Sequence, residues 1–85
     1  MIYVIDSIRH RDGTPHEREA RRKGHRVEIV NCRVGQSMVY GYVDEGTAVH
    51  TSLVQDVITG EGELVVWTDN SEYTFKAEVI APATE

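Results

Sequence analysis

Short segments of alternating apolar residues, separated by turn-forming residues, recur along the whole chain. They span residues 1–8, 25–34, 37–44, 49–58, 64–68 and 73–76. A period of two is typical of β-strands, in which successive side chains point to opposite faces. The Thr-Gly-Glu-Gly of residues 59–62 and the Asp-Asn of residues 69–70 are turn signals that join neighbouring strands as hairpins. The 85-residue chain is therefore predicted to be mainly β.

We expect five to six antiparallel strands curled into a small barrel, because a flat sheet of this size would leave one apolar face in water. A single domain is predicted over residues 1–80, with residues 81–85 as a disordered tail. In the segment 25–34 the apolar positions change parity, which predicts a bulge near Ile29 or Val30.

The segment 37–44 is apolar on both faces. Such a strand is either central in a closed barrel or partly committed to a partner. Its pattern therefore supports the barrel and also leaves room for a binding surface.

One short surface helix is predicted, over about residues 15–23, in the connection between the first two strands. Thr14 is placed to cap it, Pro15 fits the first helical position, and Glu17 completes a Thr-x-x-Glu capping box. Gly24 can adopt the left-handed conformation that ends a helix. Because the segment has almost no apolar side chain, the helix is expected to lie outside the core.

Three runs in the second half of the chain carry a family resemblance. They are Met-Val-Tyr-Gly-Tyr-Val-Asp at 38–44, His-Thr-Ser-Leu-Val at 50–54 and Trp-Thr-Asp-Asn-Ser-Glu-Tyr at 67–73. Together they resemble the meander of small SH3-like β-barrel proteins found in bacteria. The resemblance implies an SH3-like barrel, and such barrels bind peptides, nucleic acids or other subunits. An OB-type barrel is the alternative fold, but it normally has its helix between the third and fourth strands.

Charge is distributed unevenly along the chain. Residues 1–33 carry eight Lys and Arg against five Asp and Glu, whereas residues 34–85 carry one against nine, so the two parts have net charges of +3 and -8. The folded domain is therefore expected to be an electrostatic dipole.

The predicted helix and its flank supply five basic candidates for binding. These are Arg18, Arg21, Arg22, Lys23 and Arg26. Arg pairs with phosphate oxygens in a two-point fork, so this cluster could contact nucleic acid. Glu17 and Glu19 lie four residues before Arg21 and Lys23, and intrahelical pairs would partly neutralise the cluster. Three interpretations stay open: a solvated surface helix, a nucleic-acid contact, or a contact with an acidic protein surface, including a second copy of the chain.

Tyr40 and Tyr42 are added as candidates, because exposed aromatic residues on barrel strands stack on bases in single-strand binders. The alternative is packing in the core and at the barrel rim, with the polar tips in water. The chain has only one Trp, four Tyr and one Phe to fill the whole domain, which favours packing.

His10, Asp12 and His16, with His25 beyond them, offer imidazole and carboxylate groups that suit zinc or similar ions. Their spacing matches no standard metal motif, so they are interpreted as surface residues around a loop. No metal and no other cofactor is predicted.

Cys32 lies within a strand pattern and is interpreted as a buried structural thiol, with no catalytic signature around it.

These patterns predict a non-enzymatic interaction module that binds a protein partner or associates with itself. A nucleic-acid-binding accessory domain that uses the basic helix is the alternative. No membrane partner and no small-molecule substrate is predicted. The single cysteine and the absence of a long apolar run predict a cytoplasmic protein.

Overall fold

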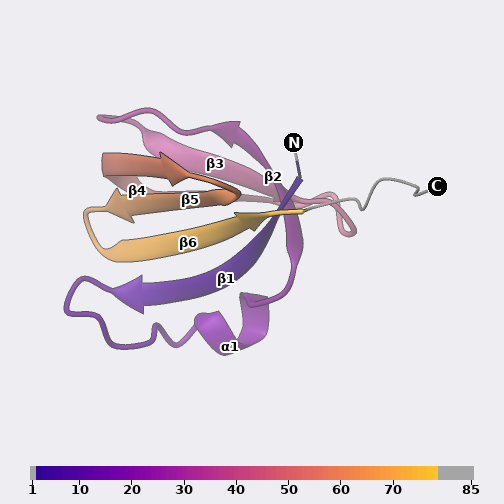
Figure 1. The fold of residues 1–85 in the computed structure, drawn as a ribbon, viewed down its shortest axis with the longest axis horizontal. Helices are drawn as coiled ribbons and strands as arrows, with labels where there is room; N and C mark the ends of the chain where they lie inside the picture. The colour runs from indigo at the N-terminus through magenta and orange to yellow at the C-terminus, as the bar shows by residue number, and fades with distance from the viewer. Residues whose placement is uncertain (1, 79–85) are drawn as a thin grey trace.

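A computed structural model describes residues 2–78, and its strands form a closed antiparallel barrel (Figure 1). The elements in chain order are β1 (Ile2–His10), α1 (Glu19–Arg22), β2 (Arg26–Asn31), β3 (Ser37–Tyr42), β4 (Ala48–Gly60), β5 (Glu63–Thr68) and β6 (Ser71–Ala77). Each strand pairs with the next along the chain, and β6 returns to pair with β1. The prediction of a mainly β barrel with a short helix in the first connection is confirmed. That position of the helix also differs from the OB arrangement.

The long strand β4 turns the corner of the barrel. Its first part, residues 48–53, pairs with β3, and its second part, residues 54–60, pairs with β5. The register shifts between Val54 and Asp56. An irregularity of this kind bends a strand and increases its twist, which lets one strand serve both sides of a small barrel.

Bulges in β1 and β2 decide which side chains enter the core. In β2 the register against β3 shifts between Ile29 and Asn31, which confirms the predicted bulge and leaves Val30 69% exposed. In β1 the register against β6 shifts just after Ile5. Ile5 and Ile8 are both buried as a result, although simple alternation would place them on opposite faces.

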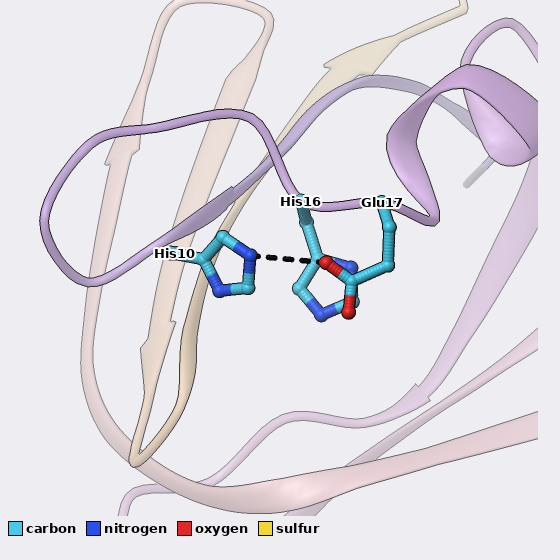
Figure 2. Close-up of side chains that lie close together, drawn as sticks. All are labelled: His10, His16 and Glu17. Atoms are coloured by element: carbon cyan, nitrogen blue, oxygen red, sulfur yellow. Dashed lines mark hydrogen bonds and ion pairs between the residues drawn. The ribbon is translucent and has the colours of Figure 1, made fainter.

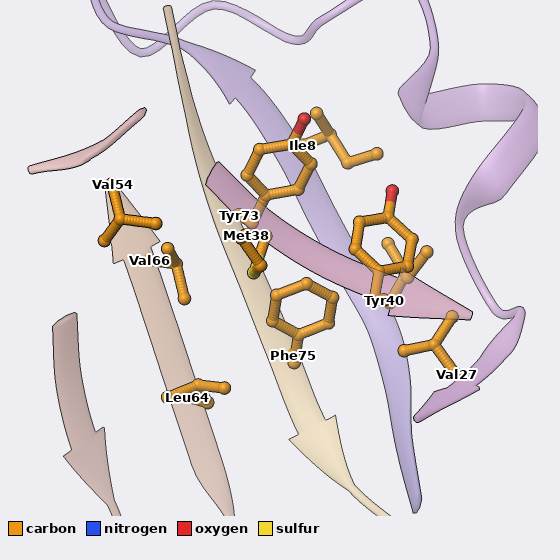
Figure 3. Packing of buried hydrophobic residues seen from close by; sticks show 10 residues of the cluster. Ile8, Val27, Met38, Tyr40, Val54, Leu64, Val66, Tyr73 and Phe75 are labelled. Atoms are coloured by element: carbon orange, nitrogen blue, oxygen red, sulfur yellow. The ribbon is translucent and has the colours of Figure 1, made fainter. Parts of the chain in front are cut away.

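The core is one cluster of apolar side chains to which all six strands contribute (Figure 3). Its buried members are Ile5, Ile8, Val27, Met38, Tyr40, Val54, Leu64, Val66, Tyr73 and Phe75. The rings of Phe75 and Tyr73 are nearly parallel, with centroids 6.0 Å apart, and Phe75 meets Tyr40 edge to face at 5.7 Å. Figure 3 shows the hydroxyls of both tyrosines pointing away from Phe75, so the polar atoms lie at one side of the cluster.

The helix is shorter than predicted, and the predicted cap is wrong. α1 covers only Glu19–Arg22, and its N-cap residue Arg18 makes no capping hydrogen bond with its side chain. Thr14 instead donates hydrogen bonds from its backbone N–H (2.9 Å) and its hydroxyl (2.6 Å) to Asp12 Oδ1. The hydroxyl that sequence reasoning assigned to a helix end is therefore used in a turn.

Contacts with β1 explain why the helix starts late. Pro15 forms an isolated β-bridge with Arg9, and the His16 N–H donates to the Ile8 carbonyl at 2.9 Å. The chain is held in an extended form along β1 up to residue 16, so Pro15 cannot occupy the first helical turn. Gly24 has the positive φ predicted for it, 89°, and leads the chain back into the sheet.

The predicted domain end at residue 80 and the predicted tail at 81–85 lie outside the described residues. Nowhere from residue 2 to residue 78 is there a helix with the length and apolar character needed to cross a membrane.

Candidate interaction site

The four cations of α1 and its two cap residues, which we call the helix cations, differ in exposure. Arg22 is half-buried, and its Nη1 donates a hydrogen bond of 3.3 Å to the hydroxyl of Tyr40. Arg18, Arg21 and Lys23 are exposed, and within residues 2–78 none of the four helix cations forms an ion pair. Arg22 is therefore bound to a core residue, whereas the side chains of the other three cations are available to a partner.

The two acidic residues near the helix bind β1 rather than the helix cations. Glu17 Oε2 lies 3.1 Å from His10 Nε2, and Glu19 Oε2 accepts a hydrogen bond of 3.1 Å from the Ile8 N–H. The pKa of Glu17 is lowered, first by its own backbone N–H and then by His10. The predicted intrahelical pairs are absent from the described part of the chain, so the helix cations keep more free charge than the sequence suggested.

Arg26 is neutralised by its neighbours. Its Nε and Nη2 donate to the two carboxylate oxygens of Glu78 at 2.6 and 3.0 Å, and its Nη1 lies 3.6 Å from Asp44 Oδ1. Hydrogen bonding to Arg26 lowers the pKa of the Glu78 carboxyl. A two-point pair of this kind is among the stronger polar contacts, so Arg26 leaves the set of free cations.

Tyr40 is not available for stacking on a ligand. It is fully buried, and this burial raises the pKa of its phenol. Tyr42 is half-buried and reaches a small pocket of about 170 Å³. That pocket is lined by Arg21, Arg22, His25, Tyr42 and Glu45. The packing interpretation is confirmed for Tyr40, and Tyr42 alone of the two remains a surface candidate.

A groove of about 370 Å³ crosses the outer face of the sheet formed by β1, β2, β3 and the start of β4. Its lining residues are Ile2, Glu28, Val30, Gly41, Tyr42, Val43, Gly46, Thr47 and Ala48. Ile2 pairs with Glu28 across β1 and β2. Gly41 lies next in that row, between Glu28 and Ala48. Since Gly41 has no side chain, the row is hollow at its centre. We call this surface the outer groove.

Apolar side chains border the outer groove, and acidic residues lie in its lining and in the adjoining turn. Val30 is 69% exposed and Val43 is 41% exposed. Glu28 is exposed and has no ion-pair partner in the described residues, and the β3–β4 turn that forms one wall also carries Asp44 and Glu45. An exposed apolar patch with a charged rim is typical of an interaction site.

A second pocket, of about 230 Å³, lies where the first connection approaches β4 and the β5–β6 turn. It is lined by His16, Glu17, Arg18, His50, Thr51, Ser52, Asn70, Ser71 and Tyr73. Almost every one of these residues is polar. Because this pocket opens at the mouth of the barrel, a common place for ligand sites, we call it the mouth pocket.

Two histidines and a carboxylate meet beside the mouth pocket (Figure 2). The rings of His10 and His16 are stacked, with centroids 4.6 Å apart and an interplanar angle of 28°. The Arg18 N–H donates a hydrogen bond of 3.0 Å to His16 Nδ1. Figure 2 shows both rings and the Glu17 carboxylate gathered in one place.

This cluster differs from the group of residues considered in the sequence. Asp12 is engaged by Thr14, and His25 Nδ1 lies 3.1 Å from the Arg22 carbonyl oxygen, away from the other histidines. Glu17, which was assigned to a helix cap, supplies the carboxylate instead. Its position directly after His16 is the only sequence signal that could have suggested this role.

Cys32 is half-buried and packs against the core, so the buried structural thiol is confirmed only in part. Its burial raises the pKa of the thiol. The group therefore remains protonated and poorly nucleophilic at neutral pH.

The comparisons with known proteins produce no match, whether with family models, curated proteins or solved structures. No relative therefore supplies a function for the domain. A function has to be inferred from the geometry of the outer groove, the helix cations and the mouth pocket.

Proposed function

We propose that this protein is a non-enzymatic interaction module built on an SH3-like barrel, and that the outer groove binds a segment of a partner protein. The observation that carries the proposal is an exposed groove, hollow at Gly41 and bordered by Val30 and Val43, on the outside of a barrel whose core is already complete. The side chains of Val30 and Val43 are not needed to fill the interior, so they are free to contact a partner.

The charges around the groove define the partner. Glu28 lines the groove without an ion-pair partner in the described residues, and Asp44 and Glu45 lie in the turn that forms one wall. A matching segment therefore presents an apolar side chain for the hollow and a Lys or Arg for the rim. Complementary charge would fix the orientation of the segment and favour its association.

Gly41→Val is the substitution that should fill the hollow. A Cβ at Gly41 would meet the Thr47 carbonyl oxygen at 3.7 Å, which is an ordinary contact, and Gly41 does not have a positive φ. Valine also suits a strand. Gly60→Val is the matched control, because Gly60 also lies in a strand and a Cβ there meets no atom within 4 Å.

A random peptide display library, selected against the unmodified domain, provides the probe. We expect the selected peptides to carry an apolar residue beside Lys or Arg. They should bind Gly41→Val at least about tenfold more weakly, a loss typical of one central contact, and bind Gly60→Val as well as the original protein. Failure to select any peptide, or equal binding to Gly41→Val, would overturn the proposal.

Two other occupants are separate outcomes of these measurements. Sedimentation over a range of protein concentrations detects association with a second copy, which Gly41→Val would have to abolish if the copy occupied the groove. Titration with single-stranded and duplex oligonucleotides at low salt tests the nucleic-acid alternative, which the exposed Arg21 and Lys23 favour and the burial of Tyr40 disfavours. Oligonucleotide binding that is lost in Arg21→Glu and kept in Gly41→Val would identify nucleic acid, and not a protein, as the partner.

A cytoplasmic location is part of the proposal and rests on the single cysteine.

A further inference from the structure

We propose that His10, His16 and Glu17 form a binding site for a divalent transition-metal ion of the zinc class. One donor atom from each residue can be chosen so that all three lie within 4.8 Å of one another. Two imidazoles and one carboxylate are a ligand set that zinc and similar ions accept. This site is separate from the outer groove, and the proposal does not depend on the function of that groove.

Backbone hydrogen bonds hold the three residues in place without any ion. The His10 N–H donates to the Thr14 carbonyl at 2.8 Å, and the Gly13 N–H donates to the His10 carbonyl at 2.9 Å. The His16 N–H is bound to the Ile8 carbonyl at 2.9 Å. Since the backbone on both sides of the loop is already ordered, only side chains would have to move when an ion binds. Such preorganisation lowers the cost of binding.

One of the side-chain distances is already close to the value that a bound ion requires. Ligands about 2.0–2.2 Å from a tetrahedral zinc ion are separated from each other by about 3.3 Å. His10 Nε2 and Glu17 Oε2 are already 3.1 Å apart. All three donor atoms lie within 4.8 Å of one another, so the Glu17 side chain, which is 76% exposed, and the two imidazole rings have to shift to reach this value.

Protons have to be rearranged at both rings. In the ion-free site the proton on His10 Nε2 makes the hydrogen bond to Glu17 Oε2. When an ion takes its place, that proton moves to Nδ1 of the same ring. At His16 the Arg18 N–H occupies the lone pair of Nδ1. An ion on Nδ1 displaces that N–H, and an ion on Nε2 requires the ring proton to move to Nδ1. Either route leaves the Arg18 amide without its acceptor, which gives the site a specific signature.

Three protein ligands leave at least one coordination position for water, as in zinc sites that remain open. His16 and Glu17 also line the mouth pocket. A bound ion would therefore lie at the edge of a polar cavity that can accommodate such water molecules.

The first experiment is a titration of tag-free protein with Zn²⁺ against a chromophoric chelator. We expect a single strong site per chain. His10→Ala and His16→Ala should each weaken it by about 100-fold or more, because even groups outside the ligand set can change metal affinity by about 100-fold. His50→Ala is the matched control, since His50 lines the same pocket but is not in the cluster, and it should leave the affinity unchanged.

The second experiment follows backbone amides by ¹⁵N NMR during the same titration. We expect the Arg18 amide signal to move when the ion binds, and the signals of Val66 and Phe75 in the core to stay in place. Glu17→Gln removes the anionic ligand at an exposed position, so it should weaken binding in a protein that is still folded. Zinc affinity that is unchanged by these substitutions, or equally weakened by His50→Ala, would overturn the proposal. So would a static Arg18 amide at saturation.

Discussion

In the barrel core, side chains from six strands surround Phe75, whereas residues 11–25 of the first connection contribute no member to that cluster. The connection is held by directed polar contacts instead. Among them are the hydrogen bond from the Ile8 N–H to Glu19, that from Arg11 to the Thr68 carbonyl, and that from Arg22 to Tyr40. Burial of apolar surface depends little on direction, but each polar contact needs one partner in one place.

This difference indicates where each region can change. Core packing tolerates little loss of volume, because neighbouring side chains cannot fully close a cavity. A polar contact in the connection can be exchanged for a contact with a ligand at a small net cost, since a typical hydrogen bond contributes only about 1 kcal/mol. Two members of the histidine cluster, His16 and Glu17, lie in the connection, and His10 lies at the end of β1. The outer groove lies on the strands of the barrel and the β3–β4 turn. In many binding proteins a rigid scaffold positions loops that carry the binding residues.

The largest expected effect is in the core. Phe75→Ala removes a fully buried ring that contacts Tyr40 and Tyr73, so the free energy of unfolding should fall by about 3–5 kcal/mol. A domain of this size has modest stability, so the variant should be largely unfolded at room temperature. Urea unfolding followed by the fluorescence of Trp67 measures the loss. Lys23→Ala, an exposed change in the connection, should stay within about 0.5 kcal/mol, and a loss comparable to that of Phe75→Ala would contradict the comparison.

A smaller effect is expected where the two regions meet. Arg22→Ala leaves the buried Tyr40 hydroxyl without its donor, so it should destabilise the domain by about 1–3 kcal/mol. In a Tyr40→Phe background the same change should cost less, because no buried hydroxyl remains to be satisfied. A double-mutant cycle from urea unfolding gives the coupling. Strict additivity would show that the connection is not bound to the core through this contact.

The smallest effect is expected from the ion pair between Arg26 and Glu78. The pKa of Glu78 is held below its usual 4.5 in the folded protein by the hydrogen bonds from Arg26. Its contribution to stability is therefore present above pH 4.5 and is lost as the pH falls through the lower, folded-state pKa. Glu78→Gln should unfold at a lower urea concentration than the original protein at neutral pH, and the two should converge in acid. A difference in urea midpoint between the two proteins that stays constant with pH would contradict the stabilising role of this ion pair.

Much of the barrel could be predicted from local pattern. Alternation of apolar residues located all six strands, and the change of parity near Ile29 located the bulge in β2. The bulge after Ile5 was missed because Ile2 and Val4 continue the simple alternation with Ile8. Only the pairing with β6 shows that the strand changes face between the two buried isoleucines.

The candidate sites were less accessible to sequence reasoning. Thr14 and Glu17 fit a helix cap, but Thr14 bonds to Asp12, two residues before it, and Glu17 meets His10 once the connection lies along β1. In the sequence, Gly41 is only an interruption of a strand pattern. It forms the floor of a groove because strand pairing places it in one row with Ile2 and Ala48 of other strands.

The sequence by itself determined the strands, the position of the helix and the positive φ of Gly24, because each depends on residues within a few positions of one another. Tertiary structure decided the start of α1, the burial of Tyr40, and the meeting of His10 and His16 with Glu17. Those features depend on which polar groups β1 and the barrel rim offer to the first connection. Glu19, for example, accepts a hydrogen bond from the N–H of Ile8, eleven residues before it, and local pattern does not contain that choice.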